Sequence, residues 1–598
     1  MEKASTPYQY IIKIMILCLV CSQIACKPSE GKKKSTQPNI IVILTDDQGW
    51  GDLSLNGNTQ ISTPNIDKLA ENGTVVERFY VNSVCSPTRA EILTGRYHVR
   101  GGVYSTSEGG ERLDLDETTI ANIFKDNGYK TAAFGKWHSG TQAPYHPNTR
   151  GFDEYYGFTS GHWGNYFSPM LDHNGEIVNG KGFLPDDLTN HALDFIETNK
   201  DEPFFIYIPY NTPHSPMQVP DRWWNKFKDK DIAIDHRYKN EENIAFTKAA
   251  YALCENIDWN VGRINTKIND LHLEENTIIV YLSDNGPNSY RYNGELKGKK
   301  GHTDEGGVRV PFIIDWKGTI PSGKKIKQIA GSIDILPTLA DLADIEVETE
   351  KPLDGISLKP LLTEEKPEWE DRYLVTYWKK NISLRNEQFM LDQDEKLFDL
   401  LKDPQQNTDI SLQYPEQLKD MIAYKKHWVE HVLSELPEKD TRTNPVGYAG
   451  FKHTQLPARD ASPHGNIKRS NRWPNDSFLT DWTSTKDSIT WNVEVLESGN
   501  YEAVVYYTCS KENVGSTIQL SFDNQTVNTK ITEPHNPPLV GFEKDRILRE
   551  ESYVKDFKPL NMGTIKLTKQ ENILTLKAIN KAADSIMDFR LLTLKKIN

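Results

Sequence analysis

Two pairs of oxygen-bearing side chains directly follow apolar runs. Asp46 and Asp47 come after the run 39–44, and Asp284 and Asn285 come after a similar run later in the chain. Continuous runs rich in β-branched residues predict buried parallel strands, and ligands of open α/β sheets bind at the carboxyl edge of such strands. Carboxylate and amide oxygens suit a hard cation such as Ca²⁺. A lone Asp-Asp pair would more often form a turn or a helix cap, but the second pair at the end of another predicted strand favours the cation. The chain has no Cys/His cluster with zinc spacing.

Helices and strands that could position these side chains alternate along the first part of the chain. The run 277–282 is preceded by apolar residues at spacings of 4, 3, 4 and 3 between 257 and 271, which predicts an amphipathic helix. A third predicted strand, 204–208, leads to His214. Alternating strands and helices indicate an α/β domain.

One cysteine stands in a long motif. Cys85-Ser86-Pro87-Thr88-Arg89 is followed by Ala90-Glu91-Ile92-Leu93-Thr94-Gly95-Arg96. This segment resembles the signature of the formylglycine-dependent sulfatases of the alkaline phosphatase superfamily. The resemblance implies that Cys85 is oxidised to formylglycine by a formylglycine-generating or sulfatase-maturating enzyme, and that the matured residue also ligates the cation.

Further segments resemble the same family, in the same order, over about residues 38–430. They are Asp46-Asp47-Gln48-Gly49, Gly135-Lys136-Trp137-His138, Thr212-Pro213-His214, Ser283-Asp284-Asn285-Gly286 and Leu296-Lys297-Gly298-Lys299-Lys300-Gly301. The resemblance implies a sulfatase, alkaline-phosphatase-like fold with a central mixed sheet. It also implies functional residues at Cys85, Arg89, Lys136, His138, His214 and Lys300, beside metal ligands at Asp46, Asp47, Asp284 and Asn285.

The mechanism that the resemblance implies is covalent catalysis. One hydroxyl of the hydrated aldehyde attacks sulfur, and the alcohol leaves with a proton from His214 or Lys300. His138 then takes the proton of the second hydroxyl as sulfate departs. Arg89, Lys136 and Lys300 would surround the sulfate or fix the diol, and such preorganised charge is usually the largest catalytic contribution.

Residues that could contact a sugar are less sharply indicated. His162 and Trp163 lie in a Gly- and aromatic-rich insertion, and His302 stands where the family more often has a small residue. We expect these three at substrate subsites, with loop packing as the alternative. Arg100 and Arg291 could recognise a uronate or a second sulfate, or could be ordinary surface residues.

The expected substrate is a sulfated polysaccharide or its oligosaccharides, with algal ulvan, carrageenan or fucoidan first and glycosaminoglycans second. A phosphonate or phosphate ester hydrolase of the same superfamily is an alternative. Asn285 favours a sulfatase, because the phosphoester enzymes commonly have Asp-His-Gly at 284–286. A non-catalytic glycan binder is the third hypothesis, although it would have no reason to hold every catalytic position.

The N-terminus has the pattern of an export signal. Lys13 precedes a short apolar run, and Ala25-Cys26 resembles the end of a bacterial lipobox. We predict a signal peptide over 1–25, lipidation at Cys26 and a polar tether over 26–37. The protein would then be exported and either anchored to the outer membrane by its lipid or, with ordinary cleavage, periplasmic.

Composition excludes two broad classes. The 598 residues carry a formal net charge of −14, which argues against a general nucleic-acid binder. Mean hydropathy of −0.62 excludes a polytopic membrane protein. Three of the six cysteines lie within the first 26 residues, and the other three are far apart and odd in number, so no disulfide framework is predicted.

The sequence pattern changes twice towards the end of the chain, which indicates domain boundaries. We predict a catalytic domain over 38–365, a small α+β lobe over 366–435 and a linker over 436–475. Alternating apolar residues such as Ile489, Trp491 and Val493 then predict a β-sandwich over 476–598. This sandwich would either bind carbohydrate or act as a spacer packed on the catalytic domain.

Overall fold

The computed structural model describes residues 37–597. The predicted signal peptide 1–25, the lipidation site at Cys26 and the tether up to residue 36 lie outside the described residues. The described part forms one compact unit.

A mixed sheet of eleven strands forms the centre of the catalytic region, in the order β11-β2-β10-β8-β1-β7-β3-β4-β5-β6 with β9 paired to β2. β1 pairs in parallel with both β7 and β8, whereas β10 is antiparallel to β8. The strands are β1 (Asn39–Asp46), β2 (Thr74–Tyr80), β3 (Lys130–Lys136), β4 (Glu154–Phe158), β5 (Met170–His173), β6 (Glu176–Asn179), β7 (Phe204–Pro213), β8 (Thr277–Ser283), β9 (Arg309–Val310), β10 (Phe312–Asp315) and β11 (Lys324–Gly331).

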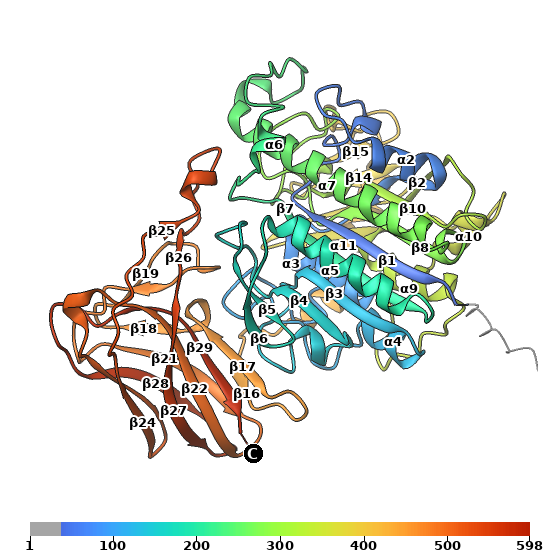
Figure 1. Ribbon diagram of the computed structural model, residues 1–598. Coiled ribbons are helices and arrows are strands. Elements are labelled where there is room, and N and C mark those ends of the chain that lie inside the picture. Colours follow the sequence, from blue (N-terminus) through green and yellow to red (C-terminus); the bar gives the residue numbers. More distant parts are fainter. Residues whose placement is uncertain (1–36, 598) are drawn as a thin grey trace, which may run out of the picture. The chain divides into compact units, whose positions relative to one another are not determined.

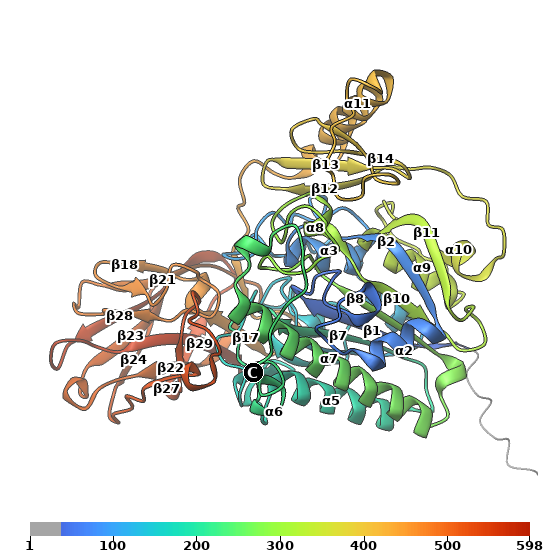
Figure 2. The ribbon, with the colours of Figure 1, turned by 90° about the horizontal axis from the view of Figure 1, so that it is seen from above.

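Helices cover both faces of this sheet (Figures 1 and 2). Ile41 and Ile43 of β1 belong to a core that includes residues of α5 and α7, while Ile40 and Val42 belong to a second core with residues of α3, α4 and α9. Alternate β1 side chains therefore fill opposite cores, which is why the run is continuously apolar. The helices are α2 (Pro64–Asn72), α3 (Cys85–Thr94), α4 (Ile120–Asp126), α5 (Leu184–Asn199), α6 (Asp221–Trp224), α7 (Ile244–Asp270), α8 (Glu305–Val308), α9 (Ile335–Leu342) and α10 (Lys359–Thr363).

The small lobe follows the catalytic region, as the sequence predicts. It contains a four-stranded sheet in the order β12-β13-β14-β15, together with the helix α11. Met421 and Trp428 of α11 are buried in a core shared with this sheet. The elements are β12 (Leu374–Trp378), β13 (Asn381–Arg385), β14 (Phe389–Leu391), β15 (Leu397–Asp399) and α11 (Pro415–His431).

The C-terminal domain is a β-sandwich of two six-stranded sheets, with the short pair β25-β26 beside them. Trp482, Trp491 and Phe589 lie in its core. The strands are β16 (Asn444–Val446), β17 (His453–Pro457), β18 (Ser462–His464), β19 (Lys468–Arg469), β20 (Leu479–Thr480), β21 (Ser488–Val495), β22 (Gly499–Thr508), β23 (Thr517–Phe522), β24 (Gln525–Lys530), β25 (Leu539–Val540), β26 (Val554–Lys555), β27 (Lys558–Leu567), β28 (Glu571–Asn580) and β29 (Asp588–Lys596).

The structure corrects the predicted linker 436–475. β16 and β18 pair with β21, and β17 pairs with β29, so this segment contributes strands to both sandwich sheets. The strands are only three to five residues long and contain proline, which hides them in a sequence pattern. The sandwich therefore begins near Asn444.

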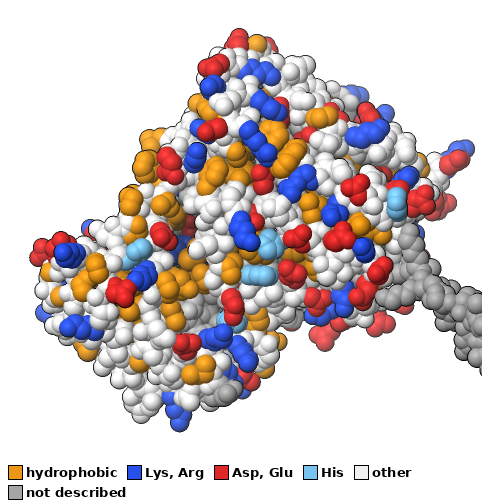
Figure 3. Space-filling view, viewed as in Figure 1, with side chains coloured by type: hydrophobic (Ala, Val, Ile, Leu, Met, Phe, Trp, Pro, Cys, Tyr) orange, Lys and Arg blue, Asp and Glu red, His pale blue; other side chains and the backbone are white. Residues whose placement is uncertain are grey.

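Charged side chains of both signs are interspersed over the face drawn in Figure 3, without a broad region of one sign. The concentrated charge of this protein is instead buried at the carboxyl edge of the central sheet.

Candidate active site

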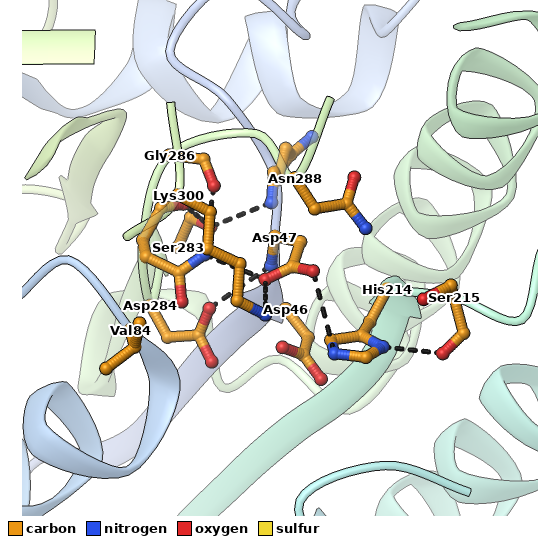
Figure 4. A network of polar contacts seen from close by, with 12 residues as sticks. Asp46, Asp47, Val84, His214, Ser215, Ser283, Asp284, Gly286, Asn288 and Lys300 are labelled. Carbon is orange, nitrogen blue, oxygen red and sulfur yellow. Dashed lines mark hydrogen bonds and ion pairs between the residues drawn. The ribbon is translucent and has the colours of Figure 1, made fainter. Parts of the chain in front are cut away.

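Three neighbouring strands end at the same place. In the register of the sheet, Thr45 of β1 lies opposite Ser283 of β8, and Asp46 lies opposite Pro213 of β7. The residues that follow these strand ends, Asp47, His214 and Asp284, are therefore brought together (Figure 4). β3, the next strand beyond β7, ends in Lys136.

Two lysines neutralise the first pair of carboxylates. The Lys136 ammonium lies 2.8 Å from Asp46 Oδ2, and the Lys300 ammonium lies 2.6 Å from Asp47 Oδ1. Asp47 has a positive φ of 69°, which is uncommon for a residue other than glycine and turns the chain sharply after β1. Adjacent carboxylates can therefore face the same buried space while each keeps its own cation.

Asp284 is held by an arginine of α3. Arg89 donates to Asp284 Oδ2 from Nε at 3.1 Å and from Nη2 at 2.7 Å, and its Nη1 donates to the carbonyl of Lys136 at 2.8 Å. Asn285 Nδ2 donates to Asp47 Oδ1 at 2.8 Å. Arg89, Asp284 and Asn285 are all fully buried, so this ion pair is shielded from solvent.

The cations decide which carboxyls are ionised. Burial by itself would raise the pKa of Asp46, but the ammonium of Lys136 and other nearby positive charges lower it far below its usual value. Burial likewise opposes ionisation of Asp47, and Lys300 leads the contributions that lower its pKa. Burial, reinforced by the Asp46 carboxylate, raises the pKa of Asp284 to about 7.

The donor set fits a hard divalent cation. Asp46 Oδ1, Asp47 Oδ2 and Asn285 Oδ1 are buried and have no hydrogen-bond partner among the described residues. Ligand atoms of Asp46, Cys85 and Asp284 also lie within 4.8 Å of one another. Buried oxygens without donors are costly unless something else satisfies them, and oxygen ligands are those that Ca²⁺ and Mg²⁺ prefer.

Cys85 begins α3 and points at this cluster. It is 3% exposed, and burial raises the pKa of its thiol. Thr88 Oγ1 accepts from the backbone N–H of Asn82 at 2.9 Å, and Asn82 Nδ2 donates to Glu91 Oε1 at 3.1 Å. Ser332 Oγ donates to the other oxygen of Glu91. Thr88 and Glu91, which lie between Cys85 and Gly95 in the motif, thus anchor α3 in its buried position.

The last residues of the motif stop the helix. Gly95 has φ of 67° and its N–H donates to the carbonyl of Glu91 at 2.8 Å, which is the left-handed C-cap that favours glycine. Arg96 forms a 3.1 Å ion pair with Glu117. The twelve-residue pattern therefore encodes a short, rigid helix as well as the reactive position.

His138 follows β3 in a strained conformation and is fully buried. Its φ is 60°, and its Nε2 lies 2.9 Å from the carbonyl oxygen of Thr106. Because a carbonyl can only accept, Nε2 carries the hydrogen and Nδ1 keeps the lone pair. Nδ1 is buried without a partner among the described residues. Burial, followed by the charge of Lys136, holds the pKa of His138 well below 6.5.

His214 approaches the cluster from β7. Its Nε2 lies 3.7 Å from Asp47 Oδ2, and its Nδ1 lies 2.5 Å from the carbonyl of Ser215 (Figure 4). The hydroxyl of Tyr166 donates to the His214 carbonyl at 2.9 Å and so helps to fix this turn. The side chain of His214 is 13% exposed.

The three predicted sugar-contact residues differ in position. The ring of His162 stacks 6.0 Å from that of His214, and its buried Nε2 has no partner among the described residues, so it belongs to the cluster. Trp163 instead stacks on Phe158 and lies under Arg590. His302 is exposed, and its side chain forms no hydrogen bond within the described part of the chain. The described residues show no contact of Trp163 or His302 with the cluster, and their role in sugar binding stays a prediction.

Arg291 and Arg100 do not lie free for a substrate. Arg291 is fully buried, pairs with Asp52 at 2.6 Å and donates to the carbonyl of Asp47 at 3.0 Å, so it supports the loop after β1. Arg100 pairs with Asp354 and Glu435. The sequence could not separate these cases because both arginines belong to loop segments.

Sequence reasoning missed the contacts made by distant backbone. The Thr106 carbonyl that orients His138 has no signal in a sequence, since any residue carries a carbonyl. Asn475 was also missed, because its partner lies in a distant part of the sequence. Its Nδ2 donates to the Thr106 carbonyl at 3.1 Å from within the C-terminal domain.

Comparison with known proteins identifies the family. Residues 38–345 match the family described as Sulfatase, and residues 299–439 match the one described as N-sulphoglucosamine sulphohydrolase, C-terminal. The chain belongs to the sulfatase family. It is therefore a sulfuric ester hydrolase, and the sheet and small lobe described above are the sulfatase fold. Members of the family generally use formylglycine and a divalent metal.

Relatives of known sequence or structure match more than half of the chain. The uncharacterized sulfatase YdeN of Escherichia coli is 30% identical, over 69% of this chain and 83% of its own length. The N-acetylgalactosamine-6-sulfatase of Mus musculus is 30% identical, over 54% of this chain and 66% of its own length. The crystal structure of Ps i-CgsB in complex with k-i-k-neocarrahexaose is 32% identical, with a TM-score of 0.61, over 68% of this chain and 96% of its own length.

No helix within residues 37–597 is both long and apolar enough to cross a bilayer.

Gly161 offers a test of the packing around His138. A Cβ at this position would lie 2.6 Å from His138 Nε2 and 2.5 Å from Asn475 Nδ2, so one of them must shift. We expect Gly161→Ala to lower kcat on an aryl sulfate by about tenfold or more, because small misplacements of a reacting group are costly.

Gly331→Ala is the control for Gly161→Ala. The nearest atoms to its Cβ would lie at 3.3 Å, and its φ of −141° is ordinary for any residue. Equal activities of the two variants, measured as initial rates at saturating substrate, would show that the close packing around Gly161 has no catalytic consequence.

Proposed function

We propose that this sulfatase removes sulfate esters from a sulfated algal polysaccharide or its oligosaccharides, with carrageenan as the first candidate among carrageenan, ulvan and fucoidan. The observation that carries the site assignment is the position of Cys85, whose sulfur lies among the carboxylates of Asp46 and Asp284 at the start of α3. A thiol surrounded by carboxylates and cations in a closed site matches the requirement of a residue that matures into the nucleophile.

The choice of substrate rests on similarity. A relative with 32% identity over two thirds of the chain has been crystallised with a neocarrahexaose. Glycosaminoglycans are the second candidate, supported by the 30% identity with an N-acetylgalactosamine-6-sulfatase. Fold alone does not determine the sugar.

Maturation and the cation would supply the reactive chemistry. Formylglycine made from Cys85 supplies a hydrated nucleophile, and a bound Ca²⁺ supplies a Lewis acid for the sulfate oxygens. Asp46, Asp47, Asp284 and Asn285 would hold the ion through oxygen. The unpartnered buried oxygens of Asp46, Asp47 and Asn285 support this assignment, and the larger, flexible coordination of Ca²⁺ suits carboxylates that arise from two strand ends.

The chain's own cations would bind the transferred group. Arg89, Lys136 and Lys300 balance the three carboxylates of the cluster, so a divalent ion would leave an excess of positive charge. That excess would attract a sulfate ester into the site and stabilise negative charge on its oxygens in the transition state. Lys300 is 20% exposed and is the one of the three that can reach a ligand from solvent.

The two histidines would move protons. Nδ1 of His138 carries a lone pair at neutral pH, so it can act as a base. Nε2 of His214 faces Asp47 at 3.7 Å, while its Nδ1 is engaged by a carbonyl, which directs Nε2 to a leaving oxygen. Lys300 is the other donor available to that oxygen. His162 would contact the bound ester between these groups.

Export and maturation complete the proposal. A lipid on Cys26 would tether the enzyme to the outer membrane, with a soluble periplasmic form as the alternative, and the maturing partner would be a formylglycine-generating or sulfatase-maturating enzyme. The proposed lipid anchor rests on the sequence pattern of segment 21–26, and the proposed maturation rests on that of segment 85–96.

Desulfation of defined oligosaccharides tests the function directly. We expect sulfate release from carrageenan oligosaccharides to exceed that from ulvan, fucoidan and glycosaminoglycan oligosaccharides, as measured by mass spectrometry of the products. Cys85→Ala should lower the rate by about 10³-fold or more, because it removes the nucleophile. The peptide containing residue 85 of active enzyme should be lighter than the thiol form by about 18 Da.

A preference for an aryl phosphate over an aryl sulfate would overturn the assignment as a sulfatase. Release of sulfate from glycosaminoglycans alone would keep the reaction and correct the substrate.

Removal of the divalent ion tests the cation site. We expect exhaustive dialysis against EGTA to lower kcat by about tenfold or more, with Ca²⁺ restoring it better than Mg²⁺, because Mg²⁺ needs near-ideal octahedral ligands. Ca²⁺ should also raise the melting temperature of the dialysed protein, since a ligand of the native state stabilises it. Full activity in protein shown by elemental analysis to be free of divalent metal would contradict the site.

The pH dependence of kcat tests the base. The pKa of His138 lies well below 6.5, so the neutral base is lost only as the pH falls through that lowered value. We therefore expect kcat to stay constant on going from neutral pH down to about 6.5 and to fall only below it. An acid limb centred at or above 6.5, measured at saturating substrate and Ca²⁺, would contradict this arrangement.

A further inference from the structure

The C-terminal sandwich reaches the active site at two places. One is the segment from Arg459 to Asn475, and the other is the segment from Gly541 to Ser552. Both contain buried polar side chains, including Asn475, which is 8% exposed, and Arg549, which is also 8% exposed. Each segment contacts a loop that carries one of the two histidines.

The first contact lies behind His138. The carbonyl oxygen of Thr106 accepts from His138 Nε2 at 2.9 Å and from Asn475 Nδ2 at 3.1 Å. This shared acceptor fixes the hydrogen on Nε2 and leaves Nδ1, which is buried and unpartnered among the described residues, as the acceptor. A carbonyl held by a second donor cannot rotate away from the imidazole without losing both hydrogen bonds.

Asn475 is itself held rigidly. Its Oδ1 accepts from Arg459 Nη1 at 3.2 Å and from Ser160 Oγ at 3.3 Å. Gly161 fills the gap between Asn475 and the His138 ring so closely that a Cβ there would overlap both. Arg459 is in turn paired with Glu111 of the catalytic domain at 3.1 Å. The amide therefore has one orientation, with its nitrogen towards Thr106.

The second contact lies behind His214. The carbonyl of Ser215 accepts from His214 Nδ1 at 2.5 Å, and the hydroxyl of the same serine donates to the carboxylate of Glu551. Gln218 Nε2 donates to the carbonyl of Gly541 at 2.6 Å, so a second hydrogen bond from the sandwich holds the turn. Figure 4 shows Ser215 beside the His214 ring, on the side opposite to Asp47.

We propose that Asn475 and Glu551 of the sandwich are positioning residues for the two histidines, Asn475 acting through the Thr106 carbonyl on His138 and Glu551 acting through Ser215 on His214. The sandwich is then part of the catalytic unit, because it adds a second hydrogen bond to each residue whose carbonyl binds one of the imidazoles. This inference rests on the proton-transfer roles proposed above for His138 and His214.

The two positions should affect different halves of the reaction. His214 would act while the alcohol leaves, and His138 would act afterwards, while sulfate leaves. Loss of orientation at His138 should therefore slow only the second half, whereas loss at His214 should slow the first. Measuring release of the alcohol before the steady state distinguishes a slow first half from a slow second half of the reaction. A defect in folding alone would not slow one half and spare the other.

Asn475→Ala tests the first contact in the full-length, matured enzyme. On an aryl sulfate we expect kcat to fall by about tenfold with KM changed less than about twofold, which is the range seen when groups that orient a reacting residue are lost. A burst of aryl alcohol, equal to the concentration of active enzyme, should precede the steady state. Gln455→Ala is the matched control, because its amide also joins the domains, through Asp172, but contacts neither histidine loop.

Glu551→Ala tests the second contact. We expect kcat to fall by about tenfold without any burst, and more steeply for aryl sulfates with poorer leaving groups, because protonation of the leaving oxygen is impaired. Glu551→Gln keeps an oxygen that can accept from Ser215 and should recover most of the activity. Glu550→Gln is the control for charge, since Glu550 is exposed and pairs with Arg472 inside the sandwich.

Several results would overturn the inference. Rates of Asn475→Ala and Glu551→Ala within about twofold of the parent would do so. So would equal losses in Gln455→Ala and Glu550→Gln, or losses accompanied by a matching fall in melting temperature, because the interface would then act only through stability. A parent enzyme that releases no sulfate from any ester would refute the proposed function instead.

Discussion

Three carboxyl groups, Asp46, Asp47 and Asp284, lie almost entirely out of water at one edge of the central sheet. Burying a carboxylate costs several kcal/mol unless it is paired and hydrogen bonded. Here each has its own cation, supplied by β3, by α3 and by the loop before α8. Asp46 and Asp47 each keep one unpaired oxygen, and ligand atoms of these two carboxylates lie within 4.8 Å of each other. The arrangement is stable as charge pairs and still offers ligands to a metal.

That requirement explains how the surrounding elements are arranged. α3 must begin at the cluster so that Cys85 and Arg89 both face it, and a network through Asn82 and Glu91 fixes the helix there. Arg291 holds the loop after β1 from behind, through Asp52. Residues that touch no substrate are therefore as strictly placed as those that do, because a buried charge tolerates little displacement of its partner.

The C-terminal sandwich is bound to the catalytic domain by buried polar contacts. Arg459 pairs with Glu111, and Asp476 accepts from the N–H of Gly164. An appended module used only as a tether would need no such contacts beside the histidines. Buried hydrogen bonds between domains give a single relative position, whereas an apolar interface of similar size would specify orientation less strictly.

Much of the catalytic region could be predicted from the sequence. The β1 and β8 runs are continuously apolar because both faces of the sheet are covered, so their ends, and the acidic residues after them, were evident. The motif from Cys85 to Arg96 indicated the family. The prediction of a linker over 436–475 was wrong. The short strands β16 to β18 in this segment are defined by pairing with β21 and β29 rather than by their own composition. Trp163 and His302 make no contact with the carboxylate cluster among the described residues, and their place at substrate subsites stays a prediction.

By itself the sequence determined which groups are present and which strand ends carry them, since residue type and hydrophobic period are local properties. Only the tertiary structure decided which nitrogen of His138 keeps its lone pair, which arginine supports a loop rather than a substrate, and that Asn475, 337 residues away from His138, shares its acceptor. Orientation of a side chain depends on atoms that approach from distant segments, including backbone carbonyls that every residue has, so no local pattern can encode it.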